Sequence, residues 1–256
     1  QMEQAMNQYL ILAVIISAMM VGQVSAQSFT PDDMDRPLST WDAGAAEAPE
    51  ELVDPTEEPE DEDDDEDPTF LGEPIGATRV VFVLDNSGSM GWGNVSTSPV
   101  HAPNGNVISN PTPWQAITSE MTKAVNAFSS SDKFEILVFD HTLKTWANQL
   151  VTADAAGKSA GLSWLYAFGP SGGTAFYQPL NKAFTHSGYA ECDMVVFMTD
   201  GYPFDASQTQ SAYPGWVNAK PANFKVKAFQ VGGYGSGLNS FMQWMAGQPK
   251  TTVFLK

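Results

Sequence analysis

One apolar run of the chain ends in side-chain oxygens that could bind a hard metal ion. Five apolar residues, 80–84, are followed by a turn that contains Gly88 and the polar residues Asp85, Ser87 and Ser89. The run predicts a strand buried on both faces, and such strands carry functional groups at their carboxyl ends. Alternate spacing lets the three polar side chains point the same way, as ligands for Mg²⁺, Ca²⁺ or Mn²⁺. The alternative interpretation is a helix cap or turn, where Asp and Ser are also common.

Two further segments end in groups of the same chemical kind. A glycine-rich loop, residues 169–173, leads to Thr174, and a second apolar run, residues 194–198, leads to Asp200. The carboxyl ends of parallel strands meet at one edge of a sheet. The two strand ends are therefore expected to lie together, and the side-chain oxygens of the three segments are candidates for one divalent ion.

This order, Asp-x-Ser-x-Ser, then Thr, then Asp, resembles the metal-ion-dependent adhesion site of von Willebrand factor type A domains. The resemblance implies that the hydroxyls of Ser87 and Ser89 bind the metal directly. It implies that Thr174 binds directly or through water according to state, and that Asp85 and Asp200 hold the ion through water. The remaining coordination position would be filled by a carboxylate from a partner.

The resemblance covers residues 79–255 and implies a doubly wound α/β fold of the von Willebrand A, Rossmann-like kind. Its sheet is mostly parallel, with helices on both faces and one antiparallel edge strand at residues 142–146. The alternation of helical and strand-like segments agrees with an α/β sheet. Residues 112–115 form a capping box with Pro113 at the first helical position, and apolar residues recur at helical spacing as far as Phe128.

Charge divides the chain into two parts. Residues 1–77 hold 20 acidic residues and one basic residue, whereas residues 78–256 hold 10 acidic and 11 basic residues. In residues 57–67, ten of eleven side chains are carboxylates. Such a block repels itself and buries no apolar surface, so residues 27–77 are predicted to be a disordered acidic linker before a domain at residues 78–256. Neither part has the basic patch that nucleic-acid binding requires.

Residues 1–26 are typical of a targeting segment. Thirteen mostly apolar residues, 10–22, precede a small-residue sequence that ends at Ala26 and fits a signal-peptide cleavage site. No basic residue precedes the apolar run, which departs from that pattern, so a membrane anchor formed by residues 10–26 is the alternative. Both interpretations predict an extracytoplasmic domain that is secreted, periplasmic or membrane-anchored.

Three more residues are candidates for the rim of the site. Trp92 and His101 lie in a loop-like insertion, residues 91–106, which follows Ser89 and must begin near the metal. The insertion could instead be a solvated, variable loop. Asp205 is either a second-rank metal ligand or the cap of the helix that follows.

Three aromatic residues follow Asp200 in the sequence. By the resemblance, Tyr202, Tyr213 and Trp216 belong to a segment that runs from the metal face into the next helix. They would form part of an interface if exposed and part of the core if buried, and the sequence leaves both open.

The predicted function is a metal-dependent protein-binding module outside the cytoplasm. Mg²⁺, or Ca²⁺ or Mn²⁺, would capture an Asp or Glu carboxylate of a protein partner, in adhesion or assembly. A metal-dependent hydrolase is the first alternative, but no His or Glu of the three metal segments could act as general base, and no catalytic residue is predicted. The second alternative is a scaffold with a purely structural metal.

The acidic linker has two interpretations. It is either a spacer or an internal ligand whose carboxylates compete with a partner for the metal. The second interpretation requires residues 68–77 to act as a free tether, which would span roughly 33 Å when extended.

Overall fold

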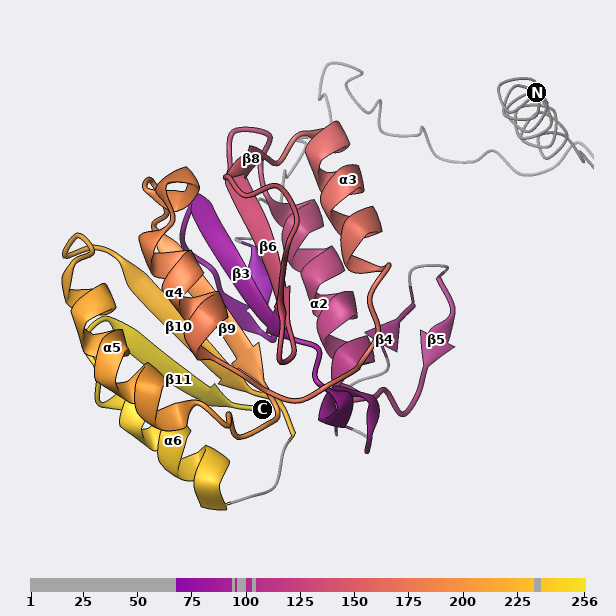
Figure 1. Ribbon diagram of the computed structural model, residues 1–256. Coiled ribbons are helices and arrows are strands. Elements are labelled where there is room, and N and C mark those ends of the chain that lie inside the picture. The colour runs from indigo at the N-terminus through magenta and orange to yellow at the C-terminus, as the bar shows by residue number, and fades with distance from the viewer. Residues whose placement is uncertain (1–67, 94, 96–99, 103–104, 233–235) are drawn as a thin grey trace, which may run out of the picture. The chain divides into compact units, whose positions relative to one another are not determined.

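A computed structural model describes residues 68–256 except residues 94, 96–99, 103–104 and 233–235. The predicted targeting segment and the acidic block at residues 57–67 lie outside the described residues. Within the described part, no helix is both long and apolar enough to cross a bilayer. A seven-stranded sheet with helices on both faces forms the domain (Figure 1).

The centre of the sheet is parallel, as the sequence predicts. Strand β3 (Arg79–Asp85) lies between β6 (Lys133–Phe139) and β9 (Met194–Thr199) and runs parallel to both. Strands β10 (Lys225–Gln230) and β11 (Thr251–Leu255) extend the sheet on the β9 side. Every residue of β9, and every residue of β3 after the first, is buried, which confirms strands covered on both faces.

The opposite edge is antiparallel, which confirms the edge strand predicted at residues 142–146. Strand β7 (Leu143–Thr145) pairs antiparallel with β6, and the short β8 (Val151–Thr152) pairs with the beginning of β6. The chain reverses at Asp140, whose carboxylate accepts hydrogen bonds from the backbone N–H and the hydroxyl of Thr142. The side chain of Asp140 therefore defines the turn between β6 and β7.

Among the described residues, five α-helices cover the two faces of the sheet (Figure 1). Helices α2 (Pro113–Ala127) and α3 (Ala155–Leu165) lie on one face. Helices α4 (Tyr177–Thr185), α5 (Ala206–Asn218) and α6 (Ser236–Ala246) lie on the other. Alternate residues of β3 point into the two layers: Val80, Phe82 and Leu84 toward α2 and α3, and Val81 and Val83 toward the other helices.

The predicted capping box at the start of α2 is present. The backbone N–H of Gln115 donates to Thr112 Oγ1 at 3.3 Å, and the backbone N–H of Thr112 donates to Gln115 Oε1 at 2.9 Å. Pro113 occupies the first helical position. Two of the N–H groups near this end of the helix therefore have partners, which stabilises its first turn beside the loop after β3.

The folded part begins earlier than the boundary predicted at residue 78. Strands β1 (Thr69–Phe70) and β2 (Glu73–Pro74) form a small hairpin, and the side chains of Phe70 and Ile75 are buried in the core with α2. Residues 68–77 are consequently part of the domain. They do not form the free tether that competition by the acidic linker would need, because burial of two apolar side chains fixes them to the domain.

The insertion after β3 is not simply a solvated loop. A 3-10 turn, η2 (Gly88–Gly91), follows β3, and further on β4 (Val100–His101) and β5 (Val107–Ile108) form an antiparallel hairpin. The side chains of Val95 and Val100 are buried in the core on the α2 side. The described part of the insertion thus extends that core instead of standing free.

Candidate metal site

The parallel pairing of β3 and β9 brings the ends of these two strands together at one edge of the sheet. Leu84 pairs with Met198, so Asp85 and Thr199 follow side by side. Thr199 Oγ1 donates to Asp85 Oδ2 at 2.6 Å, and the backbone N–H of Gly201 donates to Thr199 Oγ1 at 3.0 Å. These contacts turn the chain after β9 and set Asp200 beside the first motif.

The first motif folds back on its own carboxylate. The backbone N–H of Ser87 donates to Asp85 Oδ1 at 2.7 Å, a local turn that Asp favours. The two serine hydroxyls then lie 3.2 Å apart, and Ser89 Oγ donates to Asp200 Oδ1 at 2.7 Å. Side chains 111 positions apart in the sequence are therefore in direct contact.

Thr174 reaches the same cluster from the glycine-rich loop. A Cβ added to Gly201 would lie 2.9 Å from Thr174 Oγ1 and 3.6 Å from Ser89 Oγ. Both hydroxyls therefore lie against Gly201, where a larger residue would crowd them. The structure thus brings together all five side chains that the sequence singled out as metal ligands.

Within the part of the chain that the structure describes, the two carboxylates of this cluster have no cationic partner. Asp85 is 0% and Asp200 is 7% exposed, and among the described residues neither forms an ion pair. Burial raises the pKa of Asp85 to about 7, despite hydrogen bonds from Thr199 and Ser87. Burial also raises the pKa of Asp200, against the hydrogen bond from Ser89. A divalent cation would offset the cost of this uncompensated negative charge.

The donor atoms fit a hard cation. The cluster contains three hydroxyl and two carboxylate side chains, and oxygen ligands of this kind bind Mg²⁺, Ca²⁺ or Mn²⁺. In the part of the chain that the structure describes, no three His, Cys, Asp or Glu side chains gather as a metal site. Hydroxyl groups must therefore supply much of any coordination at this edge.

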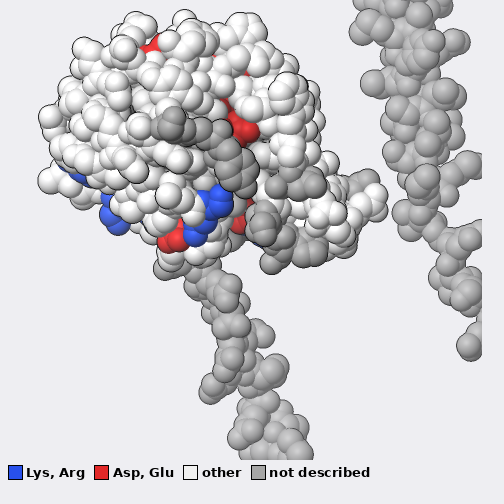
Figure 2. All heavy atoms as spheres, turned by 90° about the horizontal axis from the view of Figure 1, so that it is seen from below, with Lys and Arg blue, Asp and Glu red and all other residues white. Residues whose placement is uncertain are grey.

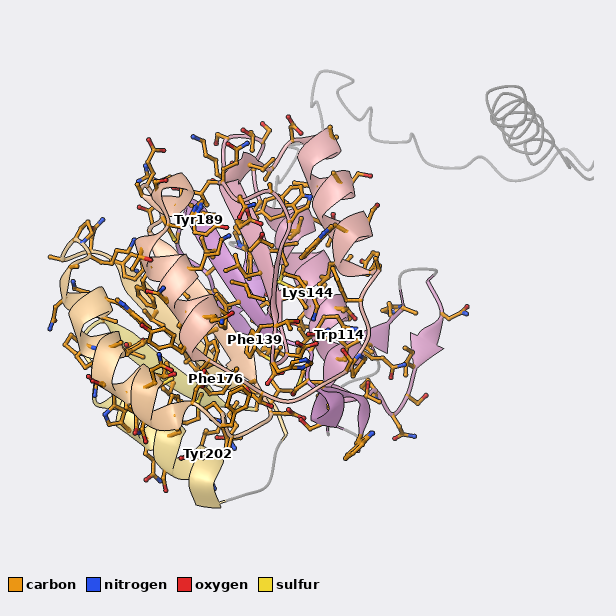
Figure 3. All side chains as sticks on the ribbon, in the orientation of Figure 1. Trp114, Phe139, Lys144, Phe176, Tyr189 and Tyr202 are labelled. Atoms are coloured by element: carbon orange, nitrogen blue, oxygen red, sulfur yellow. The ribbon has the colours of Figure 1, made fainter. Side chains whose placement is uncertain are left out.

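Aromatic side chains border the cluster. Trp92 is 78% exposed, and its backbone N–H donates to the carbonyl of Ser89 at 2.9 Å. Tyr202 is 55% and Phe204 is 72% exposed, and the backbone N–H of Phe204 donates to the carbonyl of Thr174 at 3.1 Å. Figure 3 shows Tyr202 at the edge where β3 and β9 end, and Figure 2 shows that few charged side chains occupy this face.

The other two rim candidates have different places. Asp205 accepts hydrogen bonds from the backbone N–H groups of Phe176 and Tyr177, both at 2.9 Å, so its carboxylate caps the start of α4 and not its own helix. The sequence could not show this, because the capped N–H groups lie nearly thirty positions earlier in the chain. His101 is exposed on β4, in the hairpin beside α2.

The aromatic residues after Asp200 divide between surface and core. Tyr213 is buried, and its hydroxyl lies 2.9 Å from Thr251 Oγ1. Trp216 is partly buried, with its ring centroid 6.1 Å from that of Phe184. Of the three residues that the sequence left open, only Tyr202 faces outward beside the cluster.

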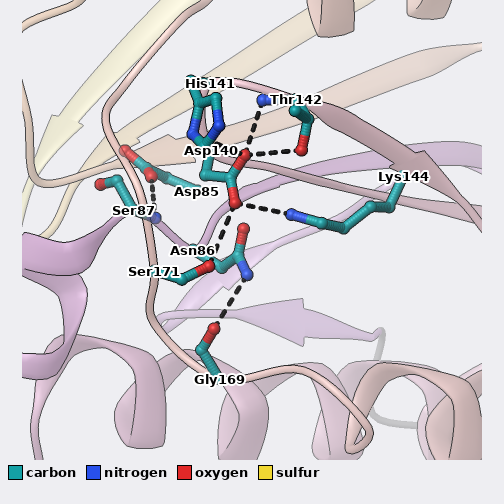
Figure 4. A network of polar contacts seen from close by, with 9 residues as sticks. All are labelled: Asp85, Asn86, Ser87, Asp140, His141, Thr142, Lys144, Gly169 and Ser171. Atoms are coloured by element: carbon teal, nitrogen blue, oxygen red, sulfur yellow. Dashed lines mark hydrogen bonds and ion pairs between the residues drawn. The ribbon is translucent and has the colours of Figure 1, made fainter.

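Sequence reasoning missed a polar network next to the cluster (Figure 4). Asp140 accepts hydrogen bonds from Thr142, from Lys144 Nζ at 2.8 Å and from Ser171 Oγ at 3.1 Å. Burial alone would raise the pKa of Asp140, but the bonds from Lys144 and Thr142 outweigh burial and lower the pKa to about 2. A signal was available, because Asp140 directly follows β6, a parallel neighbour of β3.

Asn86 and His141 also belong to this neighbourhood. Asn86 Nδ2 donates to the carbonyl of Gly169 at 3.1 Å, and the carbonyl of Asn86 accepts from the backbone N–H of Ser171 at 2.8 Å. His141 Nδ1 would lie 2.3 Å from a Cβ added to Gly172, so the imidazole lies against the glycine-rich loop. The fold thus places a histidine beside a metal segment although none of the three segments contains one.

Comparison with known proteins agrees with this architecture. Residues 108–250, more than half of the 256, match the family model of the von Willebrand factor type A domain. No curated protein matches the chain.

Several solved structures resemble the domain at low sequence identity. The PilB minor pilin from Streptococcus sanguinis has a TM-score of 0.51 at 13% identity, with 72% of this chain and 59% of that chain covered. A von Willebrand factor type A protein from Catenulispora acidiphila has a TM-score of 0.49 at 18% identity, covering 70% of this chain but only 38% of that one. Manganese-loaded TRAP protein from Plasmodium vivax has a TM-score of 0.48 at 14% identity, with coverages of 70% and 68%. The family match over more than half of the chain, which the sheet order and the helices on both faces agree with, shows that the chain belongs to the von Willebrand factor type A domain family.

Proposed function

We propose that the domain binds a protein partner through a divalent cation, Mg²⁺ or else Ca²⁺ or Mn²⁺. The observation that carries this proposal is a pair of buried carboxylates at the carboxyl edge of the sheet, Asp85 and Asp200, neither of which has a cationic partner among the described residues. Asp85 accepts from the backbone N–H of Ser87, and Asp200 accepts from the hydroxyl of Ser89. Domains of this family are commonly adhesion or protein-interaction modules.

Each residue of the cluster has a role in the proposal. Ser87, Ser89 and Thr174 provide neutral hydroxyl ligands, so the bound ion keeps more of its positive charge than it would in an all-carboxylate site. Asp85 and Asp200 compensate part of that charge. The ion, when bound, supplies the positive charge that attracts an Asp or Glu carboxylate of the partner.

The aromatic border favours a protein partner over a small anion. Trp92, Tyr202 and Phe204 are exposed next to the cluster, on a face with few charged side chains (Figure 2). Exposed aromatic residues are enriched at protein interfaces, where they bury large apolar areas. We therefore propose that the partner's carboxylate is flanked by apolar residues that cover these rings.

The alternative of a hydrolase would need a general base near the ion. His141 is the imidazole that the fold brings to the glycine-rich loop, but its Nδ1 faces Gly172 and lies 3.4 Å from Asp140 Oδ1. A ring that packs on the loop from the Asp140 side supports the loop and does not favour general-base chemistry. Binding without catalysis is the proposal that these contacts support.

We further propose that the domain acts outside the cytoplasm. The support is the apolar segment at residues 10–22 with the small residues that follow it. The likeness to a minor pilin concerns the fold alone and does not support a location, because the two chains are only 13% identical.

Two experiments test the proposal. Calorimetry of the purified protein with Mn²⁺ and with Mg²⁺ should detect one site, and the double variant Asp85→Ala, Asp200→Ala should abolish it. Unchanged affinity in that variant would exclude the site. Affinity purification from an extracytoplasmic fraction should then yield a partner that EDTA releases, and a partner retained in EDTA would favour the structural-metal scaffold.

A further inference from the structure

The loop that carries Thr174 has no regular structure of its own. Residues 168–176 belong to no helix or strand, although the proposed metal site needs the Thr174 hydroxyl at a fixed place. An irregular segment loses conformational freedom only if other contacts hold it. The position of this ligand must therefore be determined by contacts with neighbouring elements, through backbone groups and side chains.

Asp140 contacts this loop on both sides of Thr174. Its carboxylate oxygen Oδ2 accepts a hydrogen bond from Ser171 Oγ at 3.1 Å (Figure 4). Its backbone carbonyl accepts one from the N–H of Ala175 at 3.1 Å. These two contacts bracket Thr174, one three residues before it and the other one residue after it. A single residue at the end of β6 thus fixes both ends of the short segment that presents the hydroxyl.

The carboxylate of Asp140 is itself held firmly. Its Oδ1 accepts from the backbone N–H of Thr142 at 2.6 Å and from Thr142 Oγ1 at 2.7 Å, and its Oδ2 accepts from Lys144 Nζ at 2.8 Å. The side chain is buried and its charge is compensated by Lys144. Asp140 therefore differs from Asp85 and Asp200, which lack such a cation, and its oxygens are already engaged.

The loop also contacts the first motif, residues 85–89. The N–H of Gly88 donates to the carbonyl of Gly172 at 3.0 Å. Gly172 has a positive φ of 69°, and a Cβ there would lie 2.3 Å from His141 Nδ1 and 3.2 Å from Asp140 Cγ. Only glycine fits between these neighbours, so the loop has little room to shift.

We propose that the Asp140 side chain is a positioning group for the metal site. It acts through Ser171 to hold the segment that presents the Thr174 hydroxyl, beside the bond from Ala175 N–H to the Asp140 backbone carbonyl, while Lys144 neutralises the Asp140 charge. This inference rests on the proposed metal-binding function. It assigns to the end of β6 a part in a site whose ligands come from the loops after β3 and β9 and from the glycine-rich loop.

A double-mutant cycle on Mn²⁺ affinity tests this inference. Calorimetry would measure the Mn²⁺ affinity of four proteins: the unmodified protein, Asp140→Ala, Thr174→Ala and the double variant. Because outer-sphere partners of metal ligands typically contribute 10–100-fold in affinity, we expect Asp140→Ala to weaken Mn²⁺ binding by about tenfold. In the Thr174→Ala background the same change should have little effect, because the group that Asp140 positions is already absent.

The control is Asp193→Ala. It removes an ion pair of the same length, 2.8 Å between Asp193 and Arg79, at the amino ends of β3 and β9. It should leave Mn²⁺ affinity unchanged. Asp140→Asn, which keeps an acceptor oxygen for Ser171, should recover part of the affinity and serves as the test variant if Asp140→Ala does not fold.

Three results would overturn the inference. Equal losses of affinity in the two backgrounds would show a general effect of Asp140 on the fold, and unchanged affinity in both Asp140 variants would show no effect on the site. Either of these two results would still be compatible with the proposed function. Absence of Mn²⁺ binding by the unmodified protein would overturn both.

Discussion

The carboxylates around the candidate site have different partners: Asp85 and Asp200 accept hydrogen bonds from N–H and hydroxyl groups, whereas Asp140 also pairs with Lys144. Asp85, Ser87 and Asp200 could be predicted because each lies at the end of an apolar strand, and parallel strands end at one edge. The role of Asp205 could not be predicted. Its carboxylate caps a helix that begins at Tyr177, and a sequence pattern does not show which distant N–H groups a carboxylate will contact. Asp140 followed the same strand-end rule and was missed for lack of a motif around it.

Replacement of a serine ligand should separate metal binding from stability. Ser87→Ala removes one hydroxyl and its 3.2 Å contact with Ser89, so Mn²⁺ affinity should fall at least about tenfold. The free energy of unfolding of the metal-free protein should change by no more than about 1 kcal/mol, the typical value of one hydrogen bond. Calorimetry and urea unfolding would measure the two quantities.

The matched control for this prediction is Ser131→Ala. It removes a similar contact, 2.8 Å between the hydroxyls of Ser129 and Ser131, in the turn before β6 at the opposite edge of the sheet. The control should leave Mn²⁺ affinity unchanged. If Ser131→Ala and Ser87→Ala weakened binding equally, the first motif would have no special role.

Loss of the exposed aromatic residues should weaken partner binding and leave metal binding unchanged. Trp92→Ala and Phe204→Ala remove large exposed rings beside the cluster, so each should weaken EDTA-sensitive partner binding about tenfold or more, as buried aromatic contacts at interfaces commonly do. Mn²⁺ affinity should stay as it is, since neither ring supplies an oxygen. Surface plasmon resonance with the purified partner would measure the loss.

Val107→Ala is the control for the aromatic residues. Val107 is also exposed, but it lies on β5, beyond α2 from β3 (Figure 1). Partner binding that fell equally in Val107→Ala, or that persisted in both aromatic variants, would contradict an interface centred on the metal face.

The regular elements were easier to predict than the connections between them. The capping box predicted the start of α2, and the apolar runs predicted β3 and β9, because such patterns depend on neighbours in the chain. The hairpin of β4 and β5 was predicted as loop, since two-residue strands leave no periodic pattern. The network around Asp140 depends on β6, β7 and the glycine-rich loop together, and only the fold brings these three into contact.

The ion pair at the β6–β7 turn predicts a dependence of stability on pH. The pKa of Asp140 in the folded protein is about 2, below its ordinary value of 3.8, so ionised Asp140 stabilises the fold. This contribution is complete above about pH 5 and is lost as the pH falls through about 4 toward 2. Urea unfolding across this window should show a steeper loss of stability for the protein than for Asp140→Asn. Parallel pH profiles would contradict the prediction.

The extent of the folded domain was the part least evident from the sequence. Residues 68–77 border a strongly acidic block, and composition assigned them to the linker. Two apolar side chains among them, Phe70 and Ile75, were enough to fix the hairpin, with the Phe70 ring centroid 5.9 Å from that of Phe82 and 5.3 Å from that of Phe229. Composition averages over a segment, whereas burial depends on individual side chains.

The position of the amino-terminal boundary can be tested by truncation. A chain of residues 68–256 should fold with the stability of the full chain, whereas residues 78–256 should be less stable by several kcal/mol, because the second truncation uncovers the core beneath Phe70 and Ile75. In the full chain, Phe70→Ala should cost about 3–5 kcal/mol, as for other buried Phe residues. Equal unfolding midpoints for the two truncated chains would show that the hairpin contributes nothing.

Anomalous diffraction from crystals grown with Mn²⁺ would show whether a divalent ion lies among the five proposed ligands, Asp85, Ser87, Ser89, Thr174 and Asp200. We expect one strong peak at the carboxyl edge of β3 and β9, within about 2–2.5 Å of the Ser87 and Ser89 hydroxyl oxygens. The peak should be missing from crystals of the Asp85→Ala, Asp200→Ala double variant. A Mn²⁺ peak elsewhere on the domain, with none at this edge, would contradict the account.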